Sequence, residues 1–206
     1  MTDIPVIFSA AMVQALLAGR KTMTRRLAYT ERKTRNPAIG ESDTYLAASS
    51  WQKVAAGDRL WVREGWKPHS IYAHLPPSEM PEAKVFYLAD NNYEPSSVPG
   101  RPSIHMPRWA SRLTLLVTST KTEPLQSISD DDCFAEGLEP FGERDPDGRI
   151  FCNPLRPNEG GLGSWAFGEL WKHLHGAESW DANPLVLALG FRVIRANIDA
   201  PEARAA

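Results

Sequence analysis

The order of the hydrophobic patterns along the chain most constrains what it can fold into. Runs typical of short strands are separated by turn-rich segments and cover residues 5–8, 59–66, 84–89, 113–122 and 185–194. Helical patterns follow the first strand and precede the last one. This order predicts an α+β fold in which five or six short strands form a small, closed or nearly closed β-barrel with flanking helices.

Three helices are predicted from periodicity and capping residues. The first follows Ser9, which offers an N-cap hydroxyl. The second follows Ser129, which forms a weak capping box with Asp132. The third is expected to be capped by Ser164. Its apolar stripe has full helical spacing and consists of Phe167, Leu170, Trp171 and Leu174.

The length of 206 residues fits one domain with insertions. We predict a single domain over residues 1–198. Periodicity is lost over about 27–56 and 139–163, so both segments are expected to be long loop insertions. Residues 199–206 are rich in alanine and are expected to be a frayed tail.

Composition limits the partners that this chain could bind. Net charge is only −2, so affinity for nucleic acid would have to come from local patches. No apolar run is long enough to span a bilayer, no secretion signal is visible, and Cys133 and Cys152 lack CxxC spacing. We therefore expect a cytoplasmic protein without membrane contact or an obligate protein partner. The histidines form no convincing metal set and nucleotide-binding glycine motifs are absent, so neither metal nor cofactor is expected.

The segment over 19–26 carries four cations directly after the first predicted helix. Charge runs usually mark solvated faces, and the helix dipole favours cations near a helix C-terminus, so these residues could be purely structural. Lys21 and Thr24 could instead act as base and nucleophile, because a threonine hydroxyl needs a neighbour to accept its proton. A lysine does so only where burial or nearby cations lower its pKa. Residues 21 and 24 would face opposite sides of a strand, so the pair requires Lys21 to lie in the turn, with Thr22 as the fallback hydroxyl.

Glu136 is an acid that the dipole of the second predicted helix does not favour. The acidic residues over 130–132 suit the first helical turn, whereas Glu136 falls in the last turn. A locally unfavourable acid is a hint of function. It could pair with Lys21 or polarise an amine of a substrate.

A second basic segment, over 101–112, alternates cations with His105 and Trp109. Stacking of a base on an aromatic side chain, with arginines on the flanking phosphates, is the usual scheme for single-strand recognition. A tryptophan in the core beside surface arginines would give the same pattern, so both interpretations stay open. The candidate nucleic-acid contacts are Arg20, Arg25, Arg26, Arg108, Trp109 and Arg112.

Together, these segments resemble the ASCH family, a branch of the PUA-like fold. Residues 19–26 resemble its G-x-K-x-x-x-x-R signature, residues 57–64 its GD-x-L-x-V strand, and residues 128–137 its helix ending in A-E-G. The stretches over 102–112 and 180–184 are similar to phage and prophage members of the family.

The resemblance implies a protein that binds or processes RNA, another single-stranded nucleic acid or a modified nucleoside. One bacterial branch of the family is an amidohydrolase that removes the acetyl group from N4-acetylcytidine. Its catalytic lysine, threonine and glutamate correspond here to Lys21, Thr24 and Glu136. This chain is considerably longer than that branch, so its insertions could reshape the pocket. We expect a binding or processing role in a basic cleft around Lys21, and the metal-free amidohydrolase with Lys21, Thr24 and Glu136 is the alternative that stays open.

Overall fold

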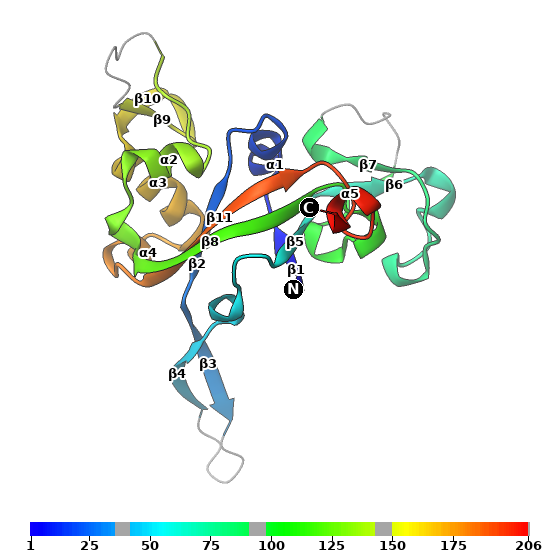
Figure 1. The fold of residues 1–206 in the computed structure, drawn as a ribbon, viewed down its shortest axis with the longest axis horizontal. Helices are drawn as coiled ribbons and strands as arrows, with labels where there is room; N and C mark the ends of the chain where they lie inside the picture. The colour runs from blue at the N-terminus through cyan, green and yellow to red at the C-terminus, as the bar shows by residue number, and fades with distance from the viewer. Residues whose placement is uncertain (36–41, 91–97, 143–149, 206) are drawn as a thin grey trace. The chain divides into compact units, whose positions relative to one another are not determined.

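The structure is a computed structural model that describes residues 1–35, 42–90, 98–142 and 150–205. It is a mixed α+β protein (Figure 1). The helices are α1 (Ala10–Leu17), α2 (Asp130–Ala135), α3 (Gly163–His175), α4 (Glu178–Asp181) and α5 (Pro201–Arg204). The strands are β1 (Asp3–Ile7), β2 (Met23–Leu27), β3 (Tyr29–Arg35), β4 (Ser42–Ala48), β5 (Arg59–Arg63), β6 (Trp66–Pro68), β7 (Val85–Tyr87), β8 (Thr114–Pro124), β9 (Ile150–Asn153), β10 (Arg156–Leu162) and β11 (Leu185–Ile194).

The largest sheet has five strands in the order β1-β5-β8-β11-β2. β1 runs parallel to β5, β5 antiparallel to β8, and β11 antiparallel to β2. From Leu60 onward β5 alternates as a half-buried strand does: Leu60 and Val62 are buried, while Trp61 and Arg63 are partly exposed. Among the described residues the sheets do not close into a barrel, so the α+β class is confirmed and the barrel is not.

The chain divides into two compact units. Unit 1 comprises Met1–Thr22, Ala56–Thr118 and Phe191–Ala206, and unit 2 comprises Met23–Ala55 and Ser119–Gly190. β8 and β11 each contribute residues to both units. A single domain over residues 1–198 stays a prediction.

Each unit has its own hydrophobic cluster. In unit 1, Trp66, Met80, Met106 and Ala110 pack together, and this cluster joins the β6–β7 pair to the connection between its two strands and to the segment that follows the pair. In unit 2 the cluster packs α2 and α3 against β9, and its buried members include Leu125, Cys133, Phe151, Phe167, Trp171 and Val186. Burial of these apolar side chains is the main stabilising term for each unit.

Local capping begins two of the helices as predicted. Ser9 caps α1 and accepts a hydrogen bond from the backbone N–H of Met12 at 3.4 Å. Gly19 follows α1 with a φ of 74°, a conformation that favours glycine. Ser129 and Asp132 form a complete capping box on α2. The third helix begins at Gly163 with Leu162 in the cap position, so the predicted cap at Ser164 is wrong.

The two segments predicted as long loops contain β-hairpins instead. β3 pairs with β4 from Tyr29 opposite Ala48 to Arg35 opposite Ser42, within the first segment. β9 pairs with β10 within the second. The sequence signal was missing because a two-stranded hairpin can expose both faces, so its strands need no apolar alternation. β10 shows this plainly, since Arg156–Leu162 is mostly exposed.

The tail predicted to fray is instead held by specific contacts. Pro201–Arg204 of this tail form α5, and Ala203 is only 1% exposed. Nη1 of Arg59 donates hydrogen bonds to the carbonyls of Ile198 and Ala203, both at 3.1 Å. Composition missed this, because the contact depends on an arginine far away in the sequence. Within the described part of the chain, no helix has the length and apolar character needed to cross a membrane.

Candidate functional site

Lys21 lies in the connection between α1 and β2. Its backbone N–H donates to the carbonyl of Ala15 at 3.2 Å, which holds it at the end of α1. Its side chain is buried, with Nζ 5.7 Å from the centre of the Phe8 ring. Because β2 begins only at Met23, Lys21 belongs to the turn and not to the strand. The condition that the sequence set for pairing Lys21 with Thr24 is therefore met.

Thr24 is the buried hydroxyl of this segment. It lies in β2 opposite Leu189 of β11 and is buried, whereas Thr22 is exposed. The carbonyl of Thr22 accepts a backbone hydrogen bond from Phe191 at 2.8 Å. Thr24 is thus better shielded from water than its fallback.

Glu136 occupies the C-cap position of α2 and is buried. One of its carboxylate oxygens, Oε1, accepts a hydrogen bond from Nη1 of Arg25 at 3.3 Å. Nη2 of the same arginine donates to Glu123 at 2.8 Å and to Asp132 at 2.7 Å. We call Arg25 and these three carboxylates the Arg25 cluster.

Burial and charge act in opposite directions within the Arg25 cluster. Burial would lower the pKa of Arg25, but Glu136, Asp132 and Glu123 outweigh it and raise that pKa. Burial would likewise raise the pKa of Asp132, but hydrogen bonds from Ser129 and Arg25 lower it overall. Both pKa shifts favour the charged forms of Arg25 and Asp132. The Arg25 side chain is 0% exposed and bound to three carboxylates, so a phosphate would have to compete with them for its guanidinium, and its role in nucleic-acid binding stays a prediction.

Arg26 and Arg20 differ in exposure. The guanidinium of Arg26 lies 5.3 Å from the centre of the Trp51 ring. Burial lowers the pKa of Arg26, partly offset by the charge of Glu136. Arg20 is exposed at the end of the turn that follows α1.

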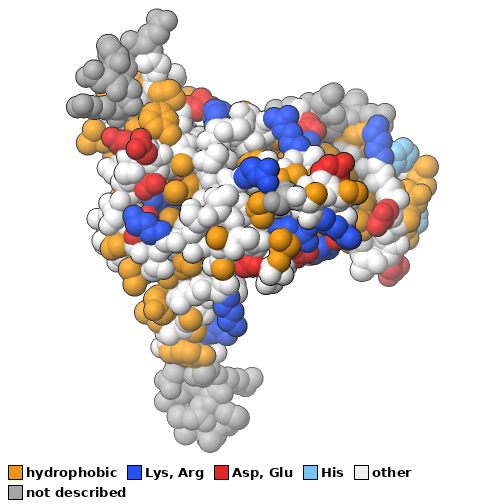
Figure 2. Space-filling view, in the orientation of Figure 1, with side chains coloured by type: hydrophobic (Ala, Val, Ile, Leu, Met, Phe, Trp, Pro, Cys, Tyr) orange, Lys and Arg blue, Asp and Glu red, His pale blue; other side chains and the backbone are white. Residues whose placement is uncertain are grey.

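Arg108 makes strong contacts within unit 1. It donates to Asp199 through Nε and Nη2, both at 2.8 Å, and to Asp3 through Nη2. Around α5, Figure 2 shows basic side chains beside acidic ones. The neighbouring Trp109 packs against the hydrophobic cluster of unit 1. This favours the interpretation of Trp109 as a core residue over that of a base-stacking platform.

Arg112 is similarly held by two carboxylates. It donates to Glu64 at 2.9 and 3.0 Å and to Asp90 at 2.9 and 2.7 Å. Its guanidinium carbon lies 3.8 Å from the centre of the Tyr87 ring. Arg108 and Arg112 are paired with carboxylates in the fold. Two of the arginines predicted to bind phosphate are therefore already neutralised.

Sequence reasoning missed Glu123, although it is a buried partner of Arg25. Residues 118–122 before it are exposed, so no local pattern marks position 123 as buried. A group of three or more histidine, cysteine or acidic side chains able to hold a metal is not found among the described residues.

Comparison of the chain with models of known protein families, with curated proteins and with solved structures finds no match.

Proposed function

We propose that this chain processes a modified nucleoside, and that it hydrolyses the amide of an N4-acylated cytidine with Lys21, Thr24 and Glu136. The observation that carries the proposal is burial: these side chains belong to residues that are 1%, 4% and 7% exposed, respectively. Buried ionisable side chains concentrate at functional sites, and Glu136 is in addition held by a hydrogen bond from Arg25. The resemblance to the ASCH family adds the roles of base, nucleophile and acid and extends the proposal to a PUA-like fold.

The balance of charges supports a nucleoside over a long nucleic acid. Arg25, Arg108 and Arg112 all have carboxylate partners within the described residues. A phosphate backbone would have to compete with these ion pairs for the same guanidinium groups. An uncharged nucleoside needs no such exchange.

In the proposed reaction, Oγ1 of Thr24 attacks the carbonyl carbon of the amide while neutral Lys21 accepts the hydroxyl proton. Arg26 or a backbone N–H stabilises the oxyanion. The C–N bond then breaks, the amine of cytidine leaves with a proton, and the acyl group stays on Thr24 as an ester. Water hydrolyses this ester, which releases the carboxylic acid and restores the hydroxyl. Glu136 orients Lys21 or supplies the proton to the leaving amine. The approach of Lys21 to the other two residues is part of the proposal.

The test is hydrolysis of N4-acetylcytidine, followed by chromatography of the cytidine released. We expect turnover by the wild type and loss of turnover in Thr24→Ala. The matched control is Thr22→Ala, which removes an exposed hydroxyl two residues away and should keep turnover. Glu136→Gln should lower the rate by roughly 10²–10⁴, the usual contribution of a general acid or base. Circular dichroism of each variant checks that the fold is intact.

Nucleic-acid binding is the other outcome that this experiment can reveal. If the wild type hydrolyses no acylated nucleoside but Lys21→Ala loses affinity for a short single-stranded RNA, the enzyme proposal is rejected and a binding module remains. Binding through phosphates should weaken steeply as salt rises, whereas hydrolysis of an uncharged nucleoside should not.

A further inference from the structure

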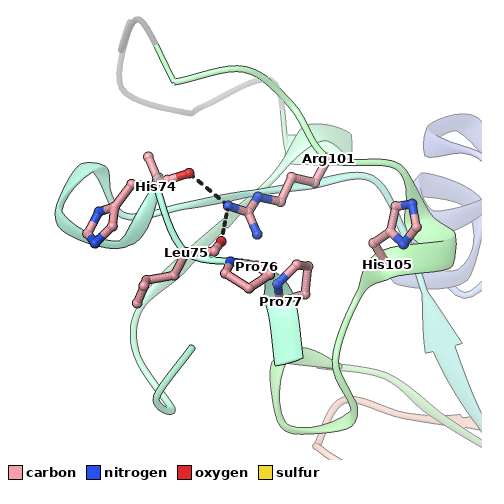
Figure 3. Close-up of a pocket in the computed structure, with 7 residues that line it drawn as sticks. His74, Leu75, Pro76, Pro77, Arg101 and His105 are labelled. Atoms are coloured by element: carbon pink, nitrogen blue, oxygen red, sulfur yellow. Dashed lines mark hydrogen bonds between the residues drawn. The ribbon is translucent and has the colours of Figure 1, made fainter. Parts of the chain in front are cut away.

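A hollow of about 450 Å³ lies on unit 1, and its lining shares no residue with the proposed catalytic set. Its lining comes from two segments, and the residues are Ala73, His74, Leu75, Pro76, Pro77, Arg101 and His105. The volume lies within the usual range for small-molecule sites. Figure 3 shows the guanidinium of Arg101 between the loop that carries His74 to Pro77 and the side chain of His105.

Arg101 is fixed at the wall of this hollow. Its backbone pairs with that of Trp66 in both directions, at 2.7 and 3.2 Å. Nη2 donates to the carbonyls of Ala73 at 2.9 Å and Leu75 at 2.7 Å. The guanidinium carbon also lies 5.4 Å from the centre of the Trp66 ring. A guanidinium that is already ordered loses little further conformational entropy when it binds a ligand.

The charge of Arg101 has no counterion in the described part of the chain. Its acceptors there are backbone carbonyls and, at 3.5 Å from Nη1, the sulfur of Met80. Arg108 and Arg112, in the same unit, each pair with two carboxylates. An arginine has five N–H donors, so Nε and one hydrogen of Nη1 have no protein acceptor among these residues.

We propose that this hollow binds the phosphate monoester of a small molecule. A fixed, partly exposed guanidinium with spare donors suits a phosphate, because charge-assisted hydrogen bonds from arginine to phosphate are among the strongest in proteins. His105 adds a second donor, and Pro76 and Pro77 give an apolar wall for the organic part of the ligand. The site shares no residue with the proposed catalytic set, so it does not depend on the proposed hydrolysis.

The first experiment is calorimetric titration of the full chain with cytidine monophosphate, inorganic phosphate and cytidine. We expect cytidine monophosphate to bind, inorganic phosphate to compete with it, and cytidine not to displace inorganic phosphate, because cytidine lacks the group that Arg101 recognises. Displacement of inorganic phosphate by cytidine, or no binding of either phosphate compound at millimolar concentration, would overturn the proposal.

Variants of the hollow locate the site. Pro76→Glu places a carboxylate at an exposed lining position without removing a contact of Arg101, and should weaken binding roughly tenfold or more. Pro81→Glu adds the same charge at an exposed residue outside the lining and should bind like the wild type. Equal loss in both variants would show only general repulsion and would reject the site.

Arg101→Lys and His105→Ala complete the test. Arg101→Lys keeps the positive charge but loses the planar guanidinium that can donate two parallel hydrogen bonds to a phosphate. It should weaken the binding of cytidine monophosphate several-fold. Because Arg101 also donates to the carbonyls of Ala73 and Leu75, the thermal unfolding of the Arg101→Lys variant is measured as well. His105→Ala removes no contact of that kind, so weaker binding in this variant supports the site even if Arg101→Lys fails to fold. Thr24→Ala should bind the nucleotide normally, which separates failure of this site from failure of the proposed catalysis.

Discussion

Arg25 of β2 and Glu136 at the end of α2 are joined by a buried hydrogen bond of 3.3 Å across 111 positions of sequence. This bond accounts for an acid in a place that the helix dipole disfavours, because the guanidinium offsets the unfavourable charge. Glu136 is therefore held in place by Arg25 whether or not it also acts on a substrate. Variants of the two residues should differ accordingly, with Arg25 dominating stability and Glu136 dominating any turnover.

Replacing Arg25 should severely destabilise the protein. Arg25→Met leaves Glu123, Asp132 and Glu136 without their shared cation. Removing one partner of a buried ion pair costs about 3–5 kcal/mol, because the remaining charge is uncompensated. Urea unfolding at neutral pH measures the difference. The control is Lys121→Met, which removes an exposed lysine that also contacts Glu123 and should have little effect. A small effect of Arg25→Met would contradict the central role of this cluster.

The contribution of Asp132 to stability should depend on pH. Its pKa is lowered in the folded state, so its stabilising effect is present above the unfolded pKa and is lost as pH falls through the folded pKa. The stability difference between the wild type and Asp132→Asn should be largest near about pH 7 and narrow below about pH 4. Unfolding midpoints across this range give the curve. The exposed Asp131→Asn serves as control, and a gap for Asp132→Asn that widens in acid would refute the assignment.

The two cysteines should react very differently with a thiol reagent. Burial raises the pKa of Cys133 to about 12, so almost no thiolate exists near neutral pH. Burial, with the charge of Glu139, also raises the pKa of Cys152, but this residue is partly exposed. In the native protein we expect slow labelling at Cys152 and none at Cys133, with both labelled in denaturant. Mass spectrometry of Cys152→Ser checks this, since native labelling should then vanish.

Removing the C-terminal helix should lower stability. Truncation after Ala200 deletes Ala203, whose carbonyl accepts a hydrogen bond from Arg59. A hydrogen bond to a charged group contributes about 1.5–3 kcal/mol, so the melting temperature should fall measurably. Truncation after Arg204 keeps that acceptor and should melt like the full chain. An unchanged melting temperature after truncation at Ala200 would mean that the tail frays, as its composition alone suggests.

The sequence by itself determined the elements whose signals are local. Periodicity and a hydroxyl three residues from its partner N–H placed α1 after Ser9 and α2 after Ser129, and the strand predicted over 185–194 matches β11. Only the tertiary structure decided which charges are neutralised. Arg25 meets Glu123 from 98 positions away, and Arg108 meets Asp199 from 91 positions away. Such partners leave no trace in local patterns, because burial and ion pairing depend on which strands and helices pack together, and the same arginines therefore looked like phosphate ligands in the sequence.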